Sequence, residues 1–251
     1  MRLDLYLVEN GFYPTRNKAK MAIEAGDVFV DGVESKKTSL DITNQIVEIK
    51  KNSNPYVSRG GLKLEAAIIK FYLDFKDKVI VDIGASTGGF TDCALSFGAK
   101  KVYAIDVGSD QLADKLLNDD RVISLEQINI TDIPYFPEPI DFLVMDVSFV
   151  SIEHLLPDLD RFIDDNNQLV CLIKPQFEVG KVYMKNGIVK DRTVHIHVIE
   201  NIIKELEKYN LGIKKICESP ILGGSGNKEF LALIGRNIKT NINVVELFRK
   251  W

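Results

Sequence analysis

The chain has 251 residues, a formal net charge of −4, and hydrophobic and charged fractions of 45% and 27%, which are typical of a globular protein. It contains no apolar run of about 18 residues and begins with no apolar signal-peptide core, so neither a membrane span nor a secretion signal is expected. The three cysteines, Cys93, Cys171 and Cys217, are widely spaced, which argues against a disulfide framework or a zinc site and favours the reducing cytoplasm.

The N-terminal part of the chain predicts two helices followed by a small sheet. A first helix begins at Leu3 and ends near Asn10. Thr15 can cap the N-terminus of a second helix that runs through Ala25, and Gly26 is suited to end it. The second helix is expected to bury Ala19, Ala22 and Ile23, and strands are expected within residues 28–33 and 45–49.

Bulk charge does not indicate a nucleic-acid partner, so such a partner would have to be met by a local cluster. Residues 1–60 contain nine Lys and Arg and eight Asp and Glu, whereas residues 61–251 contain 23 and 28. The basic residues that gather in the predicted second helix are Arg16, Lys18 and Lys20, with Arg2 as a candidate neighbour in the fold. On charge alone, a solvated helix face explains them better than an RNA-binding face.

The stretches at residues 15–19 and 23–32 resemble the S4 RNA-binding module of a small-subunit ribosomal protein and of pseudouridine synthases. In that family, the helix-turn-strand face docks on structured RNA through its shape and through phosphate contacts. The resemblance covers residues 1–50 and implies that Arg16, Lys18 and Lys20 face RNA.

A polar segment from Lys50 to Pro55 predicts a linker after this module. We therefore expect an S4-like RNA-binding domain at residues 1–52, a linker at residues 53–60 and a second domain at residues 61–251.

Beyond the linker, helices and strands alternate, which predicts a parallel sheet with helices on both faces. The first helix, residues 62–73, can bury Leu62, Ala66, Ile69 and Leu73 on one face. The expected strands are residues 79–83, 101–105, 121–125, 140–145, 168–173, 213–218 and 229–234. The other expected helices are residues 90–97, 109–117, 151–163 and 193–208.

Residues 82–91, Asp-Ile-Gly-Ala-Ser-Thr-Gly-Gly-Phe-Thr, form a glycine-rich loop between the first of these strands and a helix. Such a loop presents backbone N–H groups to a ligand, and adjacent glycines allow a close approach. The spacing matches neither the dinucleotide fingerprint G-x-G-x-x-G nor a Walker loop. The wider glycine spacing and the acidic residue at the strand end favour S-adenosylmethionine, with a purely structural turn as the alternative.

Polar residues follow four of the predicted strands at their carboxyl ends, where ligands of such sheets bind. Asp82 ends the first strand, and Asp106, 24 positions later, ends the second, where an acidic residue often meets ribose hydroxyls. Asp146 and Lys174 leave neighbouring strands and can form a close acid–amine pair. A lysine shielded from water there is a candidate base, although a neighbouring carboxylate favours its charged form.

Five stretches resemble the FtsJ-like (RrmJ-like) class of RNA 2′-O-methyltransferases, namely residues 58–64, 82–91, 145–149, 174–177 and 226–231. Joined to the S4-like module, the chain resembles the TlyA family of rRNA cytidine 2′-O-methyltransferases, also known as hemolysin A. The resemblance implies an α/β fold, in which a Rossmann-like methyltransferase domain with a seven-stranded, mostly parallel sheet follows a small α+β S4-like domain.

The resemblance also implies roles for individual residues, since the Lys-Asp-Lys-Glu tetrad of the class corresponds to Lys63, Asp146, Lys174 and Glu229. Lys174 would take or polarise the hydroxyl proton and Asp146 would orient it, while Lys63 and Glu229 would hold the ribose and the lysine network. The implied cofactor-binding residues are Asp82, Gly84, Ala85, Ser86, Thr87, Gly88, Gly89, Phe90, Asp106, Val107, Asn129 and Asp146. The implied RNA-binding residues are Arg2, Arg16, Lys18, Lys20 and Arg59. Without the resemblance, Lys63 is better explained as a solvated helix lysine and Glu229 as a strand-edge charge.

Two further segments are expected near these residues. Lys185-Asn186-Gly187 predicts a turn or a mobile lid near Lys174, and residues 223–226 predict a flexible turn that delivers Glu229.

The sequence therefore predicts S-adenosylmethionine-dependent 2′-O-methylation of a cytidine ribose in ribosomal RNA, with 23S rRNA as the first candidate and 16S rRNA as the second. The expected partners are ribosomal RNA or ribosomal subunits in the cytoplasm, without a metal or a membrane, and a monomer is the default expectation. A non-catalytic RNA-binding or ribosome assembly factor is the alternative. A membrane-lysing protein is less well supported, because no strongly amphipathic basic helix is evident.

Overall fold

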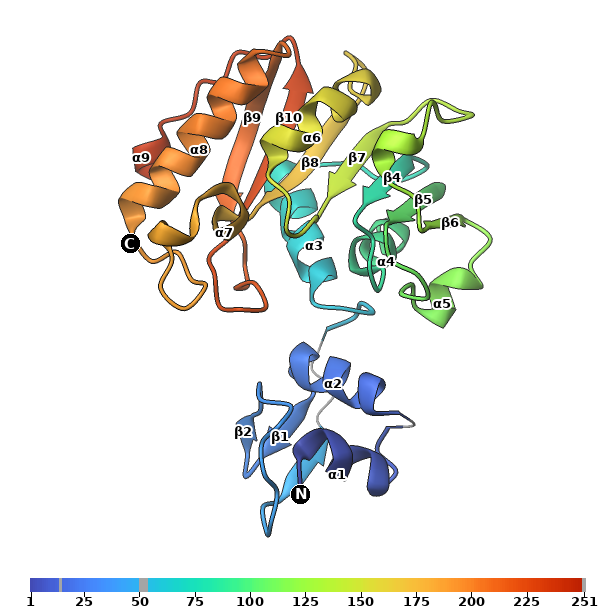
Figure 1. Cartoon of the computed structure of the whole chain (residues 1–251). Coiled ribbons are helices and arrows are strands. Elements are labelled where there is room, and N and C mark those ends of the chain that lie inside the picture. The colour runs from blue at the N-terminus through green and yellow to red at the C-terminus, as the bar shows by residue number, and fades with distance from the viewer. Residues whose placement is uncertain (14, 50–53, 250–251) are drawn as a thin grey trace. The chain divides into compact units, whose positions relative to one another are not determined.

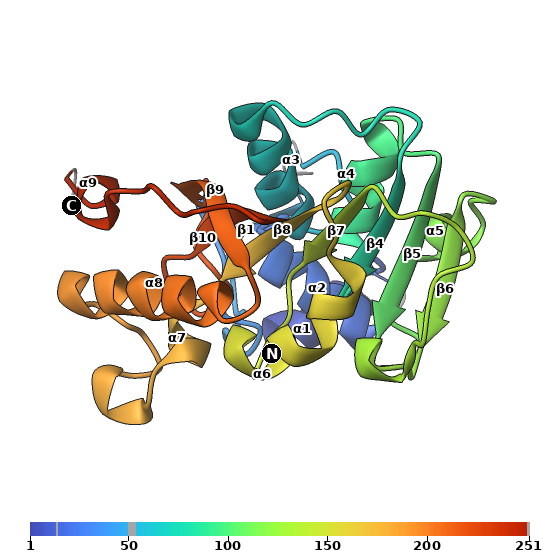
Figure 2. The ribbon, with the colours of Figure 1, turned by 90° about the horizontal axis from the view of Figure 1, so that it is seen from above.

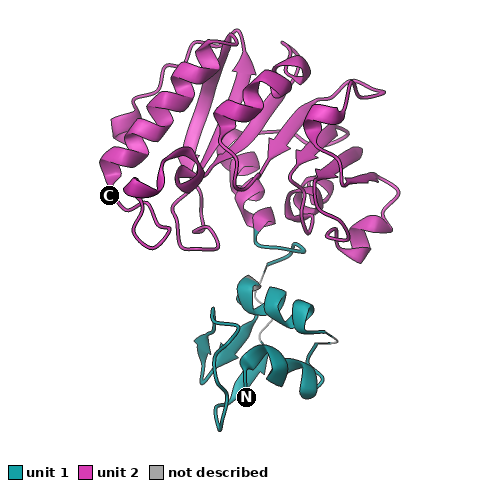
Figure 3. Cartoon of the chain, viewed as in Figure 1, with its two compact units in different colours: residues 1–59 teal, residues 60–251 magenta. Residues whose placement is uncertain are grey.

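The chain divides into two units, residues 1–59 and residues 60–251 (Figures 1 and 3). The computed structural model describes residues 1–13, 15–49 and 54–249. Residues 50–53, which belong to the predicted linker region, lie outside the described residues.

The first unit packs two helices against a small antiparallel sheet. Its elements are α1 (Leu3–Glu9), α2 (Arg16–Ala25), β1 (Val28–Val30), β2 (Val33–Glu34) and β3 (Val47–Ile49), with the strand order β2-β1-β3. Thr15 Oγ1 accepts a hydrogen bond from Lys18 N at 3.2 Å, and Gly26 ends α2 with a φ of +83°, as predicted. The predicted apolar face of α2 is also confirmed, because Ala19, Ala22 and Ile23 are buried.

The second unit is built on a seven-stranded sheet in the order β6-β5-β4-β7-β8-β10-β9. The strands are β4 (Val79–Ile83), β5 (Lys101–Asp106), β6 (Val122–Glu126), β7 (Phe142–Met145), β8 (Gln168–Ile173), β9 (Leu211–Glu218) and β10 (Phe230–Arg236). Neighbouring strands from β6 to β8 pair in parallel, and β10 runs antiparallel to both β8 and β9. The prediction of a mostly parallel seven-stranded α/β sheet is confirmed.

Helices cover both faces of this sheet. They are α3 (Gly60–Phe71), α4 (Gly89–Ser96), α5 (Asp114–Leu117), α6 (Ile152–Leu159), α7 (Pro175–Glu178), α8 (Arg192–Glu207) and α9 (Val244–Leu247), with 3₁₀ turns at Ile130–Asp132, Asp160–Phe162 and Lys181–Tyr183. Figure 2 shows α3 and α4 on one face of the sheet and α6 and α8 on the other. Within the described ranges, none of the helices combines the length and the apolar character needed to cross a membrane.

Helix α3 buries a different face from the predicted one. The buried side chains are Leu64, Ala67, Ile68 and Phe71. Ile69, which was assigned to the predicted face with Leu62, Ala66 and Leu73, is 59% exposed. Both sets recur at helical spacing, so periodicity alone does not choose between them. The buried face continues into Lys63, whose ammonium group finds carboxylate partners inside the unit.

The predicted helix at residues 109–117 is wrong in its first half, since α5 begins only at Asp114. Asp110 has a φ of +54°, and the backbone N–H groups of Asp110, Gln111 and Leu112 donate to the Glu126 carboxylate at 2.7–3.0 Å. A side-chain acceptor from the end of β6 thus fixes this segment as a loop.

The strand order reverses at β4, because β5 and β6 extend the sheet on one side of it and β7 and β8 on the other. In open α/β sheets, ligands bind outside the carboxyl ends of the strands at such a point. The ends of β4, β5, β7 and β8 therefore delimit the region in which a site is expected.

Candidate active site

Four charged side chains from distant parts of the second unit meet beside the ends of β7 and β8. Lys63 projects from the first turn of α3, Asp146 follows β7, Lys174 follows β8, and Glu229 directly precedes β10. Their side chains are 10%, 19%, 9% and 3% exposed, respectively. The structure thus brings together all four residues of the predicted tetrad.

The four side chains alternate in charge along a row. Lys63 Nζ lies 2.7 Å from Glu229 Oε2 and 3.7 Å from Asp146 Oδ2, and Lys174 Nζ lies 2.6 Å from Asp146 Oδ1. Two ammonium groups and two carboxylates compensate one another, which matters because an unpaired charge at this degree of burial is strongly destabilising. Lys174 stands at one end of the row.

Polar neighbours that sequence reasoning missed extend this row at both ends. Ser148 Oγ accepts a hydrogen bond from Lys174 Nζ at 2.8 Å, and Gln176 Nε2 donates to Glu229 Oε1 at 3.4 Å. Both residues lie inside stretches that carry the family resemblance, so their proximity to Asp146 and Lys174 in the sequence was the available signal.

The Glu229 carboxylate packs against Gly223. A Cβ atom at position 223 would lie 2.3 Å from Glu229 Oε1, so the absence of a side chain there leaves room for the Glu229 carboxylate as it is placed. The predicted turn at residues 223–226 therefore also has a packing role beside the tetrad.

An aromatic pair, the exposed Phe149 and the half-buried Phe177, lies next to Lys174. The Phe149 side chain is 91% exposed on a backbone with a φ of +66°, and its ring centroid lies 5.0 Å from that of Phe177. Lys174 Nζ lies 5.7 Å from the centroid of the Phe177 ring. A positive φ is unfavourable for a bulky residue, so the turn after Asp146 holds this ring outward at a cost in backbone energy. The result is a pair of tilted aromatic rings beside the amine.

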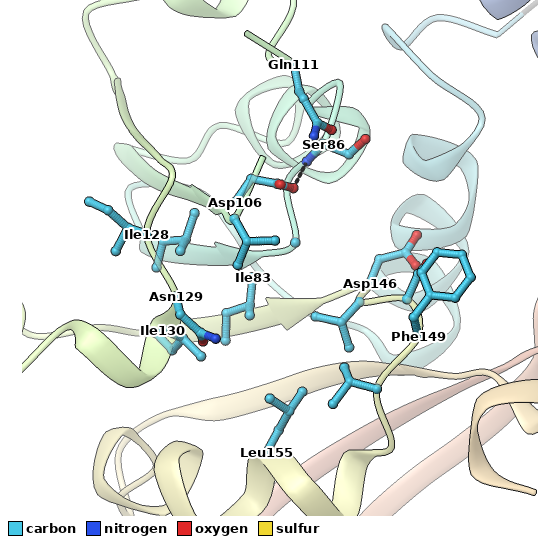
Figure 4. Close-up of a pocket in the computed structure, with 16 residues that line it drawn as sticks. Ile83, Ser86, Asp106, Gln111, Ile128, Asn129, Ile130, Asp146, Phe149 and Leu155 are labelled. Carbon is cyan, nitrogen blue, oxygen red and sulfur yellow. Dashed lines mark hydrogen bonds between the residues drawn. The ribbon is translucent and has the colours of Figure 1, made fainter. Parts of the chain in front are cut away.

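A pocket of about 530 Å³ adjoins the tetrad at the ends of β4, β5 and β7. Its apolar lining includes Ile83, Ile105, Ile128, Ile130 and Leu155. Figure 4 shows Ser86, Asp106 and Gln111 grouped on one side of this pocket, and Asp146 with Phe149 on another. Apolar walls with a few polar groups at the margins are typical of sites for nucleoside-sized ligands.

Asp106 ties the glycine-rich loop to the end of β5. Its Oδ2 accepts a hydrogen bond from Ser86 N and its Oδ1 accepts one from Gly108 N, each at 2.7 Å. An ionised carboxylate has about four acceptor positions, so Asp106 can also accept hydrogen bonds from a ligand in the pocket that it lines.

Two glycines of the loop have different neighbours. Gly84 lines the pocket with a φ of +81°, and a Cβ atom there would lie 3.2 Å from Asp146 O. At Gly88, with a φ of +92°, a Cβ atom would instead collide with the side chains of Leu112 and Leu116. Gly88 is therefore required by packing behind the loop and does not line the pocket.

The predicted cofactor-binding residues divide accordingly into two sets. Those that line the pocket are Gly84, Ser86, Asp106, Val107, Asn129 and Asp146. Those that do not line it are Asp82, Ala85, Thr87, Gly88, Gly89 and Phe90, so the structure does not bring their side chains into this pocket. Asn129 also caps the adjacent 3₁₀ turn by accepting a hydrogen bond from Thr131 N.

Asp82 is wholly buried beneath the loop. Its Oδ2 accepts a hydrogen bond from Thr91 Oγ1 at 2.7 Å. Burial raises the pKa of this carboxyl group to about 7, although the Thr91 hydrogen bond opposes the shift. The Asp82–Thr91 hydrogen bond thus links β4 to the first turn of α4.

Among the predicted RNA-binding residues of the first unit, Arg2 and Arg16 share one hydrogen-bond acceptor, Asp4. Asp4 is fully buried and accepts hydrogen bonds from the guanidinium groups of Arg2 and Arg16 at 2.9–3.1 Å. Hydrogen bonding by Arg2 holds the pKa of Asp4 well below its usual range. Lys18 is exposed and Lys20 is half-buried on the same helix as Arg16, whereas Arg59 lies at the last position of the unit and is half-buried.

No group of three or more His, Cys, Asp or Glu side chains in the described part of the chain is placed to hold a metal ion.

A sequence model of FtsJ-like methyltransferases matches residues 56–236. The chain belongs to the FtsJ-like methyltransferase family. This FtsJ-like methyltransferase also matches a model of the S4 domain at residues 1–43, as the sequence predicts.

Relatives match this FtsJ-like methyltransferase over nearly its whole length. Hemolysin A of Brachyspira hyodysenteriae is 44% identical over 240 residues, which cover 92% of this chain and 98% of that protein. The 16S/23S rRNA (cytidine-2'-O)-methyltransferase TlyA of Mycobacterium tuberculosis is 37% identical over 239 residues, which cover 91% and 87% of the two chains. A solved structure from Streptococcus thermophilus, whose name contains the word hemolysin, is 39% identical with a TM-score of 0.76, covering 100% of this chain and 97% of that one.

Proposed function

We propose that this protein transfers a methyl group from S-adenosylmethionine to the ribose 2′-hydroxyl of a cytidine in ribosomal RNA. The observation that carries the proposal is the buried row Glu229–Lys63–Asp146–Lys174, whose Asp146 also lines a nucleoside-sized pocket. The cytidine and the RNA class are taken from the name of the relative that is 37% identical.

The pocket fits the cofactor in size and chemistry. Its volume of about 530 Å³ and its isoleucine and leucine walls suit an adenosine, and Asp106 suits the two ribose hydroxyls. Gly84 leaves open a space that a Cβ atom would fill, next to the backbone of Asp146. Residues on the tetrad side, Asp146 and Phe149, would then border the reactive end of the ligand.

S-adenosylmethionine, when bound, supplies an electrophilic methyl group on a sulfonium centre. The chain's own residues would position the nucleophile and remove its proton. Lys174 Nζ would accept the proton of the 2′-hydroxyl while the ribose oxygen takes the methyl group and the sulfur–methyl bond breaks to leave a neutral thioether, and such a role is typically worth about 10²–10⁴-fold in rate. Ser148 and Asp146 fix the direction of the Lys174 amine through the contacts at 2.8 and 2.6 Å.

Lys63 and Glu229 would act on the position of this amine through Asp146. The Lys63 ammonium shares the Asp146 carboxylate with Lys174, at 3.7 and 2.6 Å, so Lys63 helps to hold the carboxylate that orients the Lys174 amine. Glu229 in turn holds Lys63 in place through their contact at 2.7 Å. Most of the remaining rate gain would come from positioning the two reactants, for which effective molarities can be large.

We propose that residues 1–52 form the RNA-binding domain and residues 61–251 the methyltransferase domain, with the linker at residues 53–60. The paired guanidinium groups of Arg2 and Arg16 offer a bidentate surface to phosphates, as suits the S4 family. A protein that modifies ribosomal RNA works where ribosomal subunits are, so we place it in the cytoplasm.

The test is incubation of the purified protein with labelled S-adenosylmethionine and unmodified large or small ribosomal subunits, kept separate. We expect label in one rRNA, and nuclease digestion with mass spectrometry should locate it on the 2′-oxygen of a cytidine. RNA binding without transfer would instead support the assembly-factor alternative, and leakage of liposomes at the same protein concentration would support the lytic one.

A further inference from the structure

Two loops of the second unit run side by side next to the tetrad. The first loop, residues 179–190, follows α7 after Lys174, and the second loop, residues 219–228, leads directly into Glu229. Figure 1 shows them as neighbouring orange and red loops at the carboxyl end of β8. We call residues 179–190 and 219–228 together the loop pair.

The buried side chain of Asn227 links the two loops through hydrogen bonds. Asn227 is 1% exposed, its Oδ1 accepts a hydrogen bond from Val189 N at 3.0 Å, and its Nδ2 donates to Gly187 O at 2.9 Å. The turn in the first loop is also defined, since Asn186 and Gly187 have φ values of +53° and +77° between the bridged residues Lys185 and Ile188. The arrangement of the two loops is therefore defined by these hydrogen bonds and by the turn.

The loop pair carries only positive charge. It contains Lys181, Lys185, Lys190 and Lys228 and no Asp or Glu, whereas residues 61–251 as a whole contain more acidic than basic residues. Lys181, Lys185 and Lys190 are exposed, and Lys228 is ion-paired with Glu218 at 2.8 Å. A basic surface in an otherwise acidic unit attracts a polyanion locally.

The loop pair also exposes apolar and aromatic side chains among its lysines. Val182 is 86% exposed, Tyr183 is 57% exposed and Leu222 is 51% exposed. Lysines that neutralise a backbone, interleaved with an aromatic ring on which a base can stack, are the features with which proteins hold single-stranded nucleic acid.

We propose that the loop pair is a second RNA-docking surface, which holds the nucleotides flanking the target ribose. The inference rests on the proposed function and names the part of the substrate that this surface takes. Lys181, Lys185 and Lys190 contact phosphates, and Tyr183 stacks on an unpaired base. Because the second loop continues into Glu229 and the first follows Lys174 through one turn of α7, RNA on this surface is held within reach of the tetrad.

The variant that tests the phosphate contacts is K181A/K185A/K190A. Its matched control is K76A/K100A/K239A, which removes three exposed lysines at the opposite ends of the strands, before β4, before β5 and after the antiparallel β10. Binding to unmodified large and small ribosomal subunits is measured at about 50 and about 200 mM salt, with S-adenosylmethionine affinity and unfolding midpoint as checks of the fold.

We expect the loop-pair variant to bind its subunit more weakly than wild type at low salt, and the deficit to shrink roughly tenfold at the higher salt, since fewer counterions are released. The control variant should follow wild type. Tyr183→Ala should weaken binding by about tenfold without changing the salt dependence, and Tyr183→Phe should retain binding because the ring remains.

Equal binding by the loop-pair and control variants overturns the inference, even if wild-type protein methylates RNA normally. If wild-type protein binds subunits through the loop pair but transfers no methyl group to either, the proposed function fails while the surface stands. Binding to vesicles of phosphatidylglycerol and phosphatidylcholine is measured as well. If the loop-pair variant binds these vesicles more weakly than wild type but binds subunits normally, the surface contacts membranes and the inference is wrong.

Discussion

Lys63 and Glu229 are 166 positions apart in the sequence, yet Lys63 Nζ lies 2.7 Å from Glu229 Oε2 in a buried ion pair. The pair joins the first turn of α3 to the loop before β10, and Asp146 connects it to Lys174. The position of the amine that would act on the substrate therefore depends on groups at both ends of the second unit.

Glu229→Leu should lower the free energy of unfolding by about 3–5 kcal/mol, because it leaves the Lys63 ammonium buried without its nearest partner. The double variant K63M/E229L should recover most of that stability, since an apolar pair can replace a buried ion pair at little cost. Methyl transfer should stay low in both. Denaturant unfolding and single-turnover transfer measure the two effects, and transfer that returns together with stability would limit the pair to a role in folding.

Lys174→Ala should slow methyl transfer by about 10²–10⁴-fold while keeping the fold and the affinity for S-adenosylmethionine. Lys174→Arg should fail as well, because a guanidinium stays protonated and cannot accept a proton. The measurement is single-turnover transfer at saturating cofactor. A near-normal rate in the arginine variant would show that position 174 needs only a positive charge.

Gly84→Ala and Gly88→Ala should act in different ways. At Gly84 the new methyl group enters the pocket margin near Asp146 O, so calorimetry should show weaker S-adenosylmethionine binding. At Gly88 it meets Leu112 and Leu116, so the protein should be destabilised, and Leu116→Ala should partly restore stability in the double variant. Both glycines have positive φ, so some strain is common to the two substitutions. Unchanged cofactor affinity in a folded Gly84→Ala protein would contradict the pocket assignment.

Asp82 should impose a pH dependence on stability that Asp82→Asn removes. Its pKa is about 7 in the folded protein, above its usual value near 4, so the folded state binds the proton more tightly than the unfolded state. This contribution is fully present below about pH 4 and is lost as the pH rises through about 7, with a total of about 4 kcal/mol. The unfolding free energy of the asparagine variant minus that of wild type should thus be larger at pH 8 than at pH 5. A difference that does not change with pH would refute the raised pKa of Asp82.

R16A/K18A/K20A should weaken binding of ribosomal RNA and reduce its salt dependence, because fewer counterions are released. Affinity for S-adenosylmethionine should be unchanged. Asn17→Ala, an exposed uncharged position on the same helix, is the matched control. If the triple variant and this control bind RNA with the same salt slope, the face of α2 is only a solvated surface.

Local signals predicted the elements whose ends are chemically marked. Thr15 and Gly26 delimit α2 because a hydroxyl cap and a left-handed glycine are specified by single residues. The strands that carry Asp146 and Lys174 were likewise predicted, because fully buried parallel strands are short apolar runs. The family resemblance implied a seven-stranded, mostly parallel sheet, but the strand order, with β10 antiparallel between β8 and β9, is set by long-range pairing and was not predicted.

The remaining features depend on contacts that no local pattern contains. The buried face of α3 is selected by partners such as Glu229, and the loop at residues 109–113 is selected by the Glu126 carboxylate. For the same reason, sequence reasoning placed Gly88 against a ligand, whereas its neighbours are leucines behind the loop. Ser148 and Gln176 were missed because a lone polar residue acquires a role only from the side chain that it meets.

The route of the chain through the tetrad has a consequence for biosynthesis. Lys63 belongs to the first helix of the second unit, whereas Glu229 precedes its last strand, so translation must reach β10 before the ion pair can close. A nascent chain that already holds the glycine-rich loop, Asp146 and Lys174 still lacks the carboxylate that keeps Lys63 in place. Chains that stall or are cleaved before residue 229 are therefore expected to carry the residues of a cofactor pocket without a competent methyl-transfer centre.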